Sequence, residues 1–210
     1  MGHWSTMILN GVFVVLFVGG CVFCWWCFTR IKRATDAVKD LENVLQKYSR
    51  DSLADNYGEL QEEMAGCPYA EIWNKFERTL FKSDNEGIMM TQDPESFYND
   101  QTLLEDIPLA IFHGMPGIFT GVGLLGTFLG LTVGLTNIDF NNIETMKSGI
   151  EGLLKGTTTA FWTSVVGLIF ALAFTILSNI YCSRPYNRAR AGLIKQLNSL
   201  FPVKSIEEFL

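Results

Sequence analysis

The sequence predicts an all-α membrane protein with three transmembrane helices and cytoplasmic helical extensions. Hydrophobic residues make up 48% of the 210-residue chain, and the mean hydropathy is positive. Most of them fall in three long apolar runs, and amphipathic helical periodicity follows the first and third runs. Because a helix satisfies its own backbone hydrogen bonds in lipid, each run is expected to be helical.

The three apolar runs cover residues 7–28, about 114–136 and about 157–181, and the second and third contain no charged residue. At 1.5 Å per residue the first run reaches roughly 33 Å, enough to cross a hydrocarbon core of ~30 Å. We therefore expect four segments: a first transmembrane helix (1–28), a cytoplasmic helical segment (29–111), a two-helix membrane core (112–182) and a cytoplasmic tail helix (183–210).

Basic residues near the ends of the runs predict the orientation. Those after the first and third runs are Arg30, Lys32, Arg33, Arg184, Arg188, Arg190 and Lys195. The connector between the second and third runs has no basic excess; its charged residues are Asp139, Glu144, Lys147, Glu151 and Lys155. By the positive-inside rule the N-terminus and this connector are periplasmic, and the C-terminus is cytoplasmic, in a bacterial inner membrane.

The segments outside the apolar runs are also expected to be helical. From Ile31 to Tyr48 apolar residues recur at steps of three and four, which predicts an amphipathic helix continuous with the first span. Shorter helices are expected at about 70–81 and about 94–105, separated by residues typical of turns. The tail from about 186 to 200 carries leucines on one side and is expected to form another amphipathic helix.

The composition argues against enzyme, metal and nucleic-acid chemistry. A net charge of -6 does not suit a nucleic-acid surface, and the chain has only two histidines. Gly121, Gly123 and Gly126 form a G-x-G-x-x-G pattern, but inside a predicted span instead of after a strand. The cysteines of the first span have metal-like spacing within a lipid-embedded helix. The cytoplasmic carboxylates Glu62, Glu63, Asp84 and Glu86 lack the calcium spacing of an EF-hand. No enzyme activity, cofactor, metal or direct nucleic-acid contact is therefore expected.

Small residues form a stripe on each of the second and third spans. On the second span they are Gly117, Thr120, Gly123, Thr127, Gly130 and Gly134; on the third they are Thr157, Ala160, Ser164, Gly167, Ala171, Thr175 and Ser178. Helices associate in lipid through close packing, which small residues allow. We expect Gly123, Gly126, Gly130, Gly134 and Gly167 to serve helix packing.

Two arrangements of these stripes remain open. The small faces can meet one another within the chain, with the hydroxyls bonding back to their own helices. Alternatively, the small faces of several copies line a central space, with Thr127 and Ser164 offering hydroxyls at mid-depth. Neither span carries an ionisable side chain at that depth, and proton relays normally need one. If protons move here, another chain must supply the carboxylate.

Two stretches resemble a known superfamily. They are Gly123–Leu131 (GLLGTFLGL) and Gly149–Leu172 (GIEGLLKGTTTAFWTSVVGLIFAL), and they are similar to the MotA/TolQ/ExbB proton-channel proteins. The longer stretch Met115–Leu131 is most similar to the ZorA branch, from the Zorya anti-phage defence system. The match covers the second and third spans well and the three-span layout more loosely; the MotA branch has four spans.

The resemblance implies a homo-pentamer around two copies of a membrane partner of the MotB/TolR/ExbD/ZorB type. Each partner copy carries a transmembrane aspartate, and proton flow rotates one component inside the other. Thr127 and Ser164 match the two hydroxyl positions that face this aspartate, and Thr120 and Thr157 extend the predicted ion pathway. A TolQ/ExbB-type energiser of envelope processes and a non-conducting helical scaffold remain alternatives. Membrane lipid is an expected partner in every case.

Overall fold

The computed structural model describes residues 2–83, 87–136 and 143–203, and the chain divides into two compact units. The first unit combines residues 1–27 with 109–179, and the second combines 28–108 with 180–210. Within these described ranges, three helices are long and apolar enough to cross a membrane, as predicted. The fold class is also confirmed: the described chain is almost entirely helical, with one short β-hairpin.

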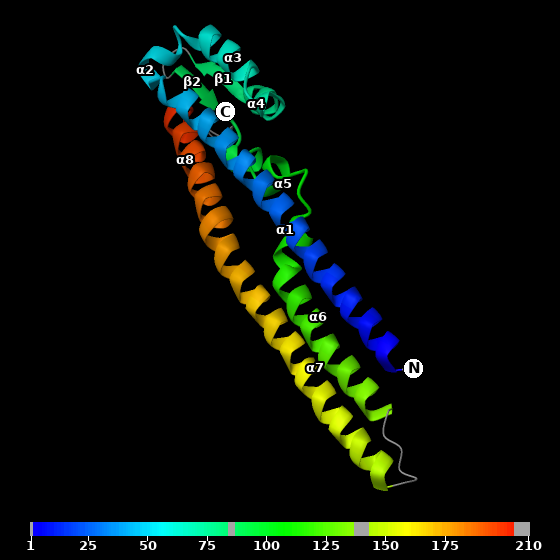
Figure 1. The fold of residues 1–210 in the computed structure, drawn as a ribbon. Helices are drawn as coiled ribbons and strands as arrows, with labels where there is room; N and C mark the ends of the chain where they lie inside the picture. Colours follow the sequence, from blue (N-terminus) through cyan, green and yellow to red (C-terminus); the bar gives the residue numbers. More distant parts are fainter. Residues whose placement is uncertain (1, 84–86, 137–142, 204–210) are drawn as a thin grey trace. The chain divides into compact units, whose positions relative to one another are not determined.

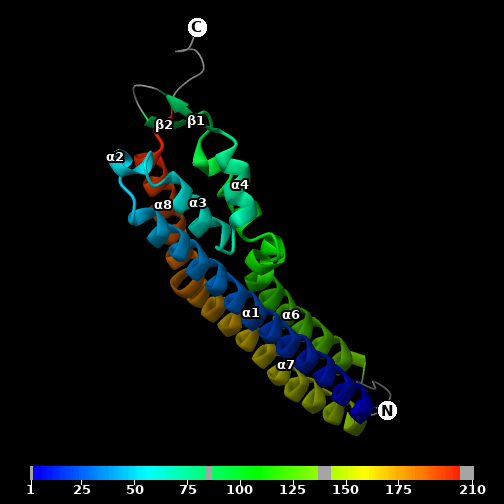
Figure 2. The same cartoon turned by 90° about the horizontal axis from the view of Figure 1, so that it is seen from above.

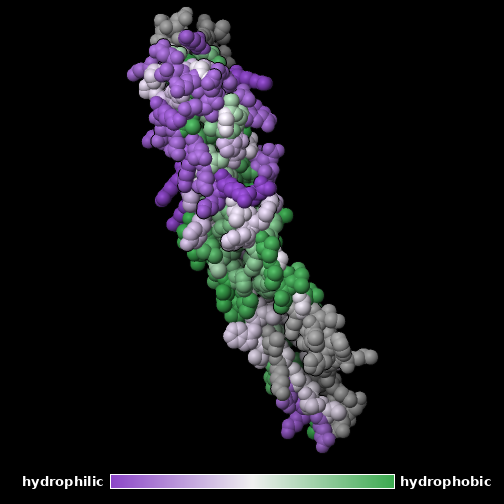
Figure 3. Space-filling view, turned by 45° about the horizontal axis from the view of Figure 1, so that its top comes forward, coloured by the Kyte–Doolittle hydropathy of each residue, from purple (hydrophilic) through white to green (hydrophobic). Residues whose placement is uncertain are grey.

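The first unit contains the apolar part of α1 (Gly2–Gln46) together with α6 (Leu109–Thr136) and α7 (Ile143–Ser178). Figures 1 and 2 show α6 and α7 running side by side along their length. Aromatic side chains join α1 to this pair: the ring of Phe17 lies 5.9 Å from that of Phe119 and 5.4 Å from that of Phe170. In Figure 3 hydrophobic residues gather over these helices.

The second unit contains the remainder of α1, which continues without a break as predicted, and α8 (Arg184–Leu200). A π-helical turn, Asn179–Ser183, joins α7 to α8. The predicted apolar stripe of α1 is buried, with Val38, Leu41 and Leu45 fully enclosed. Leu193 and Leu197 of α8 are equally enclosed, and the Gln196 Nε2 donates to the Leu45 carbonyl at 3.3 Å.

Short elements complete the second unit. They are α2 (Arg50–Leu53), α3 (Tyr57–Ala65), α4 (Ala70–Glu77), β1 (Leu80–Ser83), β2 (Gly87–Met90), a 3₁₀ turn (Pro94–Ser96) and α5 (Asp100–Leu103). Trp73, Phe76 and Tyr98 are fully buried together with Phe201, which follows α8. The ring centroid of Phe76 lies 5.7 Å from that of Trp73, 6.1 Å from that of Tyr98 and 5.9 Å from that of Phe201. This aromatic cluster holds the short elements to the tail.

Two predicted helices of the second unit were wrong in extent. The helix expected at 70–81 ends at Glu77, and Leu80–Ser83 pairs antiparallel with Gly87–Met90, with Leu80 opposite Met90. Gly87, the first residue of β2, has φ +84°, which glycine adopts without strain and other residues rarely adopt. The helix expected at 94–105 is divided, because the side chains of Asp93 and Asn99 cap two separate turns.

The helix of the third span begins before its apolar run. Glu144, Lys147 and Glu151, which the sequence assigns to the connector between the second and third runs, belong to α7, which begins at Ile143. Asp139 lies outside the described residues, as do Asp84 and Glu86 of the acidic group. The third span therefore starts with a polar helical extension before its apolar part.

Candidate ion-pathway site

Glycines bring the backbones of α6 and α7 into direct contact. A Cβ added at Gly123 would lie 2.9 Å from the carbonyl oxygen of Thr163, and one at Gly167 would lie 2.6 Å from that of Phe119. These separations are too short for any side chain larger than hydrogen, and the obstructing atoms are backbone. The two helices can be this close only because both positions are glycine.

The other predicted packing glycines lie along the same contact. A Cβ at Gly126 would meet the hydroxyl of Thr163, one at Gly130 would meet Ala160, and one at Gly134 would meet Leu153. The residue numbers rise along α6 as they fall along α7, so the helices are antiparallel. Within one chain the small faces of α6 and α7 therefore meet each other, which is the first of the two arrangements that the sequence left open.

The hydroxyls of Thr127 and Ser164 meet at this contact. Their oxygens are 2.6 Å apart, and both side chains are only half-buried. The Thr127 hydroxyl is also within reach of the Ala160 carbonyl at 3.0 Å, and that of Ser164 within reach of the Gly123 carbonyl at 3.1 Å. The structure therefore joins the two residues that the sequence singled out at mid-depth.

The protons available to this pair limit how it can bond. Each hydroxyl has one hydrogen to donate and two lone pairs to accept with. Two oxygens 2.6 Å apart repel unless one donates to the other. Either Thr127 donates to Ser164 and Ser164 donates to the Gly123 carbonyl at 3.1 Å, or Ser164 donates to Thr127 and Thr127 donates to the Ala160 carbonyl at 3.0 Å. In both arrangements the oxygen that accepts nothing within the chain keeps acceptor capacity for a donor outside it.

Thr120 and Thr157 are not brought to this pair. The Thr120 hydroxyl donates to the Pro116 carbonyl at 2.9 Å, and that of Thr157 donates to the Leu153 carbonyl at 2.8 Å. Thr120 lies seven residues before Thr127 on α6, and Thr157 lies seven residues before Ser164 on α7. Seven residues correspond to about 10 Å along the helix axis and to nearly the same helix face. The four hydroxyls therefore occupy three levels on one side of the helix pair.

Thr163 belongs to the site and was missed from the sequence. Its hydroxyl donates to the Ala160 carbonyl at 2.7 Å and lies 3.3 Å from the Gly123 carbonyl. It fills the space beside Gly126, so it supports the packing next to the hydroxyl pair. Its position directly before Ser164 was the only sequence signal, and Thr163 itself does not belong to the stripe.

Charged groups are excluded from the neighbourhood of the pair. Between Leu109 and Thr136, α6 carries His113 as its sole ionisable residue, and α7 carries none from Gly156 to Ser178. Among the residues that the structure describes, no cluster of three or more potential metal ligands occurs. The site offers hydroxyl and carbonyl oxygens only, so it can accept and donate hydrogen bonds but cannot store a charge.

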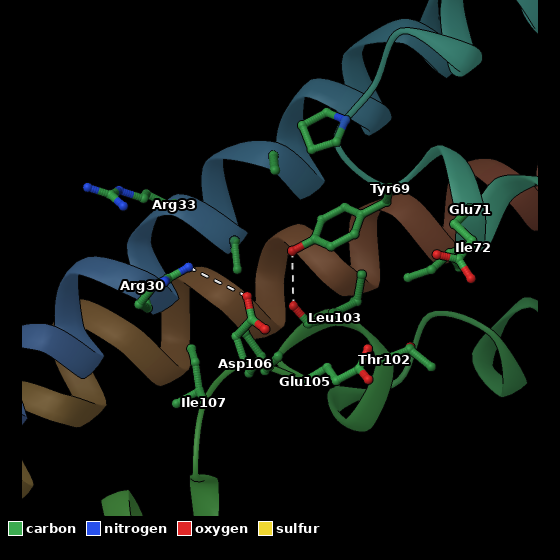
Figure 4. A pocket seen from close by; sticks show the side chains of 14 residues that line it. Arg30, Arg33, Tyr69, Glu71, Ile72, Thr102, Leu103, Glu105, Asp106 and Ile107 are labelled. Carbon is green, nitrogen blue, oxygen red and sulfur yellow. Dashed lines mark hydrogen bonds and ion pairs between the residues drawn. The ribbon is translucent and has the colours of Figure 1, made fainter.

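The second unit holds a separate, mixed-charge cavity of about 340 Å³, shown in Figure 4. A guanidinium nitrogen of Arg30 lies 3.5 Å from the Asp106 carboxylate, and the Tyr69 hydroxyl donates to the Leu103 carbonyl at 3.0 Å. Burial, with a smaller contribution from Asp106, raises the pKa of Tyr69, so the phenol stays protonated as a donor. These contacts tie the region after the first span to the residues that precede α6.

Comparison with known proteins identifies a matching family and two similar proteins. A family model described as “Anti-phage protein ZorA, Zorya type I system” matches residues 5–210. A Zorya protein ZorA of Escherichia coli O139:H28 (strain E24377A / ETEC) is 29% identical over 174 residues, which are 78% of this chain and 24% of that protein. Another, from Escherichia coli strain Crooks, is 44% identical over 59 residues, or 28% of this chain and 10% of that protein. The aligned part thus spans about a quarter of the length of the first of these relatives and a tenth of the length of the second.

Proposed function

Because the chain belongs to the ZorA-like family of the type I Zorya anti-phage system, we propose that it is the membrane subunit of an ion-driven motor. In this proposal five copies surround two transmembrane helices of a partner in the bacterial inner membrane. Each partner helix brings an aspartate to the level of Thr127 and Ser164. Proton transfer at that level drives rotation of one component inside the other, in the service of phage defence.

The hydroxyl pair at the α6–α7 contact carries this proposal. It is half-buried, it lies in the apolar part of both helices, and it has an unused acceptor position. A hydroxyl can accept a hydrogen bond from a protonated carboxyl group and, by rotating, donate one to the ionised carboxylate. The pair therefore suits a neighbour whose protonation state alternates.

The chemistry of the described helices also supports a division of labour between two chains. Serine and threonine hydroxyls do not ionise near neutral pH, so they stabilise or pass a proton without holding it. A proton-storing group must have a pKa nearer to neutral, as carboxylates do when desolvated. The partner's aspartate supplies that group in this proposal, and the chain supplies the polar surface along which it moves.

Thr120 and Thr157 extend this surface on either side of the pair. Because each lies about 10 Å from the central level, direct hydrogen bonds between levels are too long. Water, or the polar groups of the partner, would connect them. The three levels therefore mark a path along the helix pair and not a single proton wire within it.

The contact between the small faces favours a rival assignment, a non-conducting scaffold. The glycines meet within the chain, which is all that a scaffold needs. The two functions differ in what the half-buried hydroxyls do. A scaffold does not depend on Thr127 and Ser164 beyond their packing, whereas a motor requires their oxygens.

The deciding experiment removes the two hydroxyls while retaining most of the side-chain volume. The variant Thr127→Val/Ser164→Ala is expressed with its partner and the remaining defence components. We expect plaque protection to disappear and proton uptake into proteoliposomes to fall on the order of 100-fold, the lower end of what a positioned proton-transfer group contributes. Co-purification is expected to retain five copies of this chain per two of the partner.

A matched control removes one hydroxyl from each helix outside the pair. Thr132 and Thr158 are exposed and donate only to carbonyls of their own helices, at 2.8 and 3.1 Å. Thr132→Val/Thr158→Val is expected to protect normally, and Thr127→Ser, which keeps the hydroxyl, is expected to retain function. Full protection by the Thr127/Ser164 variant would refute the motor assignment, and a stable homo-oligomer that excludes the partner would support the scaffold.

A further inference from the structure

A further cavity in the second unit has a cationic rim. Its volume is about 490 Å³, and it is lined by Lys39, Glu42, Ile180, Arg184, Pro185, Arg188 and Ala189. The first two residues belong to α1, and the rest belong to α8 and the turn before it. We refer to it as the basic cavity.

Positive charge is in excess at the basic cavity. Lys39, Arg184 and Arg188 are exposed, and none of them forms an ion pair with a described carboxylate. The single acidic lining residue, Glu42, is turned towards Gly192 on α8, where an added Cβ would meet its carboxylate. It also accepts a hydrogen bond from Gln46 at 3.3 Å. With Glu42 counted, the lining residues carry a net charge of +2, which attracts an anion.

The two arginines are placed to act together. Arg184 and Arg188 are four residues apart on α8, so their side chains extend from the same face of the helix. Guanidinium groups match the oxygen geometry of phosphate in a bidentate manner, which an ammonium group cannot do. Lys39 approaches from α1, on the other wall of the cavity.

Apolar residues at one end of the cavity indicate what kind of anion it accepts. Ile180 lines the cavity and is 47% exposed, and the adjacent Tyr181 is 65% exposed. The apolar run of the third span ends at Tyr181, so Arg184 lies about 4.5 Å further along the helix axis, at the depth of the lipid headgroups. A free anion needs no apolar surface next to its site, whereas a lipid does.

We propose that the basic cavity binds the phosphate headgroup of an anionic phospholipid of the cytoplasmic leaflet, such as phosphatidylglycerol. Arg184 and Arg188 hold the phosphate oxygens, Lys39 supplies the third positive charge, and an acyl chain continues over Ile180 and Tyr181. The inference rests on the proposed placement of the chain in the membrane, but it does not require proton conduction. Basic pockets beside membrane helices on this side are suited to acidic headgroups.

The test measures lipid binding to the detergent-purified full chain after delipidation. Short-chain phosphatidylglycerol and phosphatidylethanolamine with the same acyl chains are titrated and followed by native mass spectrometry. Wild type is expected to prefer phosphatidylglycerol. Removing a juxtamembrane cation costs about fivefold in affinity for an acidic lipid, so Arg184→Gln/Arg188→Gln is expected to bind it about 25-fold more weakly.

Two further variants make the test specific. Lys32→Gln/Arg33→Gln removes the same charge from exposed positions of α1 outside the basic cavity, and we expect less than a threefold change. Arg184→Lys/Arg188→Lys keeps the charge without the fork geometry and is expected to show an intermediate loss. Circular dichroism and gel filtration verify that each variant is folded.

Three outcomes would overturn the proposal. An equal loss in both charge-removal variants would mean that only the general surface charge attracts lipid. Displacement of phosphatidylglycerol by millimolar inorganic phosphate would identify a site for free phosphate. Dissociation of the oligomer in lipid-free detergent, specific to the cavity variant, would identify an acidic segment of a neighbouring copy as the occupant. Normal phosphatidylglycerol binding by Thr127→Val/Ser164→Ala separates this result from the fate of the motor proposal.

Discussion

At the scale of single residues, not all glycines of α6 have the same role. Gly123 faces backbone atoms of α7, and the missing side chain is what allows the contact. Gly117 lies on the same sequence stripe, yet an added Cβ there would meet no atom within 4 Å. The spacing of small residues therefore predicted a packing face on the helix. The structure shows which residues of that face pack against the other helix within one chain.

This difference leads to a paired prediction. Gly167→Ala places a methyl group against the Phe119 carbonyl, so we expect a loss of about 1–3 kcal/mol in the free energy of unfolding, as in other overpacked contacts. Gly117→Ala is expected to be neutral or slightly stabilising, because alanine favours the helix. The thermal-unfolding midpoint of the full chain in detergent measures both. An equal decrease in the two variants would contradict the packing account.

Residue chemistry also explains how much of the site the sequence could predict. Thr127 and Ser164 were identified because hydroxyls are unusual in apolar spans and because they match the superfamily pattern. Their mutual hydrogen bond depends on the antiparallel register of α6 and α7, which no local pattern encodes. Thr163 was missed for the same reason: its role arises from the space beside Gly126 on the other helix.

At the scale of elements, long helices were predictable and short ones were not. The apolar periodicity of α1 and α8 extends over several turns, so one misplaced residue does not alter the pattern. The segment from Leu80 to Leu103 contains a hairpin and two capped turns of three or four residues each. Such elements depend on tertiary contacts more than on local propensity: the ring of Tyr98 packs on Phe76, and the Met90 N–H donates to the Pro202 carbonyl at 3.1 Å.

One polar contact holds α5 to α8 and can be tested. The Asp100 carboxylate accepts hydrogen bonds from the Tyr186 hydroxyl at 3.1 Å and the Arg190 guanidinium at 2.9 Å. We expect Asp100→Asn to cost about 1 kcal/mol, since both groups are partly exposed, and to lower the unfolding midpoint by about 2–4 °C. Asp106→Asn, which removes a more exposed ion pair, is the control and is expected to shift it by less than 1 °C.

The pH range of that experiment follows from Tyr186. Burial first, and then the charge of Asp100 and the hydrogen bond to it, raise the pKa of the Tyr186 phenol. A raised pKa in the folded state means that the contribution of this phenol is fully present below about pH 10 and is lost as the pH rises through the folded-state value. Measurements at neutral pH therefore see the contact intact. A larger effect of Asp106→Asn than of Asp100→Asn would contradict this assignment.

At the scale of the whole molecule, the chain crosses between its two units at more than one point. Residues 1–27 and 109–179 form one unit, and residues 28–108 and 180–210 form the other. The sequence predicted the same pieces as four consecutive segments. Which of them fold together is a tertiary property, because residues far apart in sequence, such as Leu45 and Gln196, are in contact.

The orientation of the three spans gives a prediction at this scale. An odd number of spans places the two ends of the chain on opposite sides of the membrane, and the basic flanks predict a cytoplasmic tail. Alkaline phosphatase fused after Thr136 is expected to be active, and green fluorescent protein fused after Leu200 is expected to fluoresce. The reverse pattern, with active phosphatase after Leu200, would show that the positive-inside assignment is wrong.

By itself the sequence determined the three spans, the amphipathic continuations of the first and third spans, and the lack of an ionisable side chain at mid-depth. These properties depend on composition and on periodicity along one helix. Only the tertiary structure decided that the hydroxyls of Thr127 and Ser164 meet, that Thr163 supports them, and that Lys39 joins Arg184 and Arg188 around one cavity. The physical reason is register: which faces of two helices meet depends on packing between distant segments, and a sequence pattern describes each helix alone.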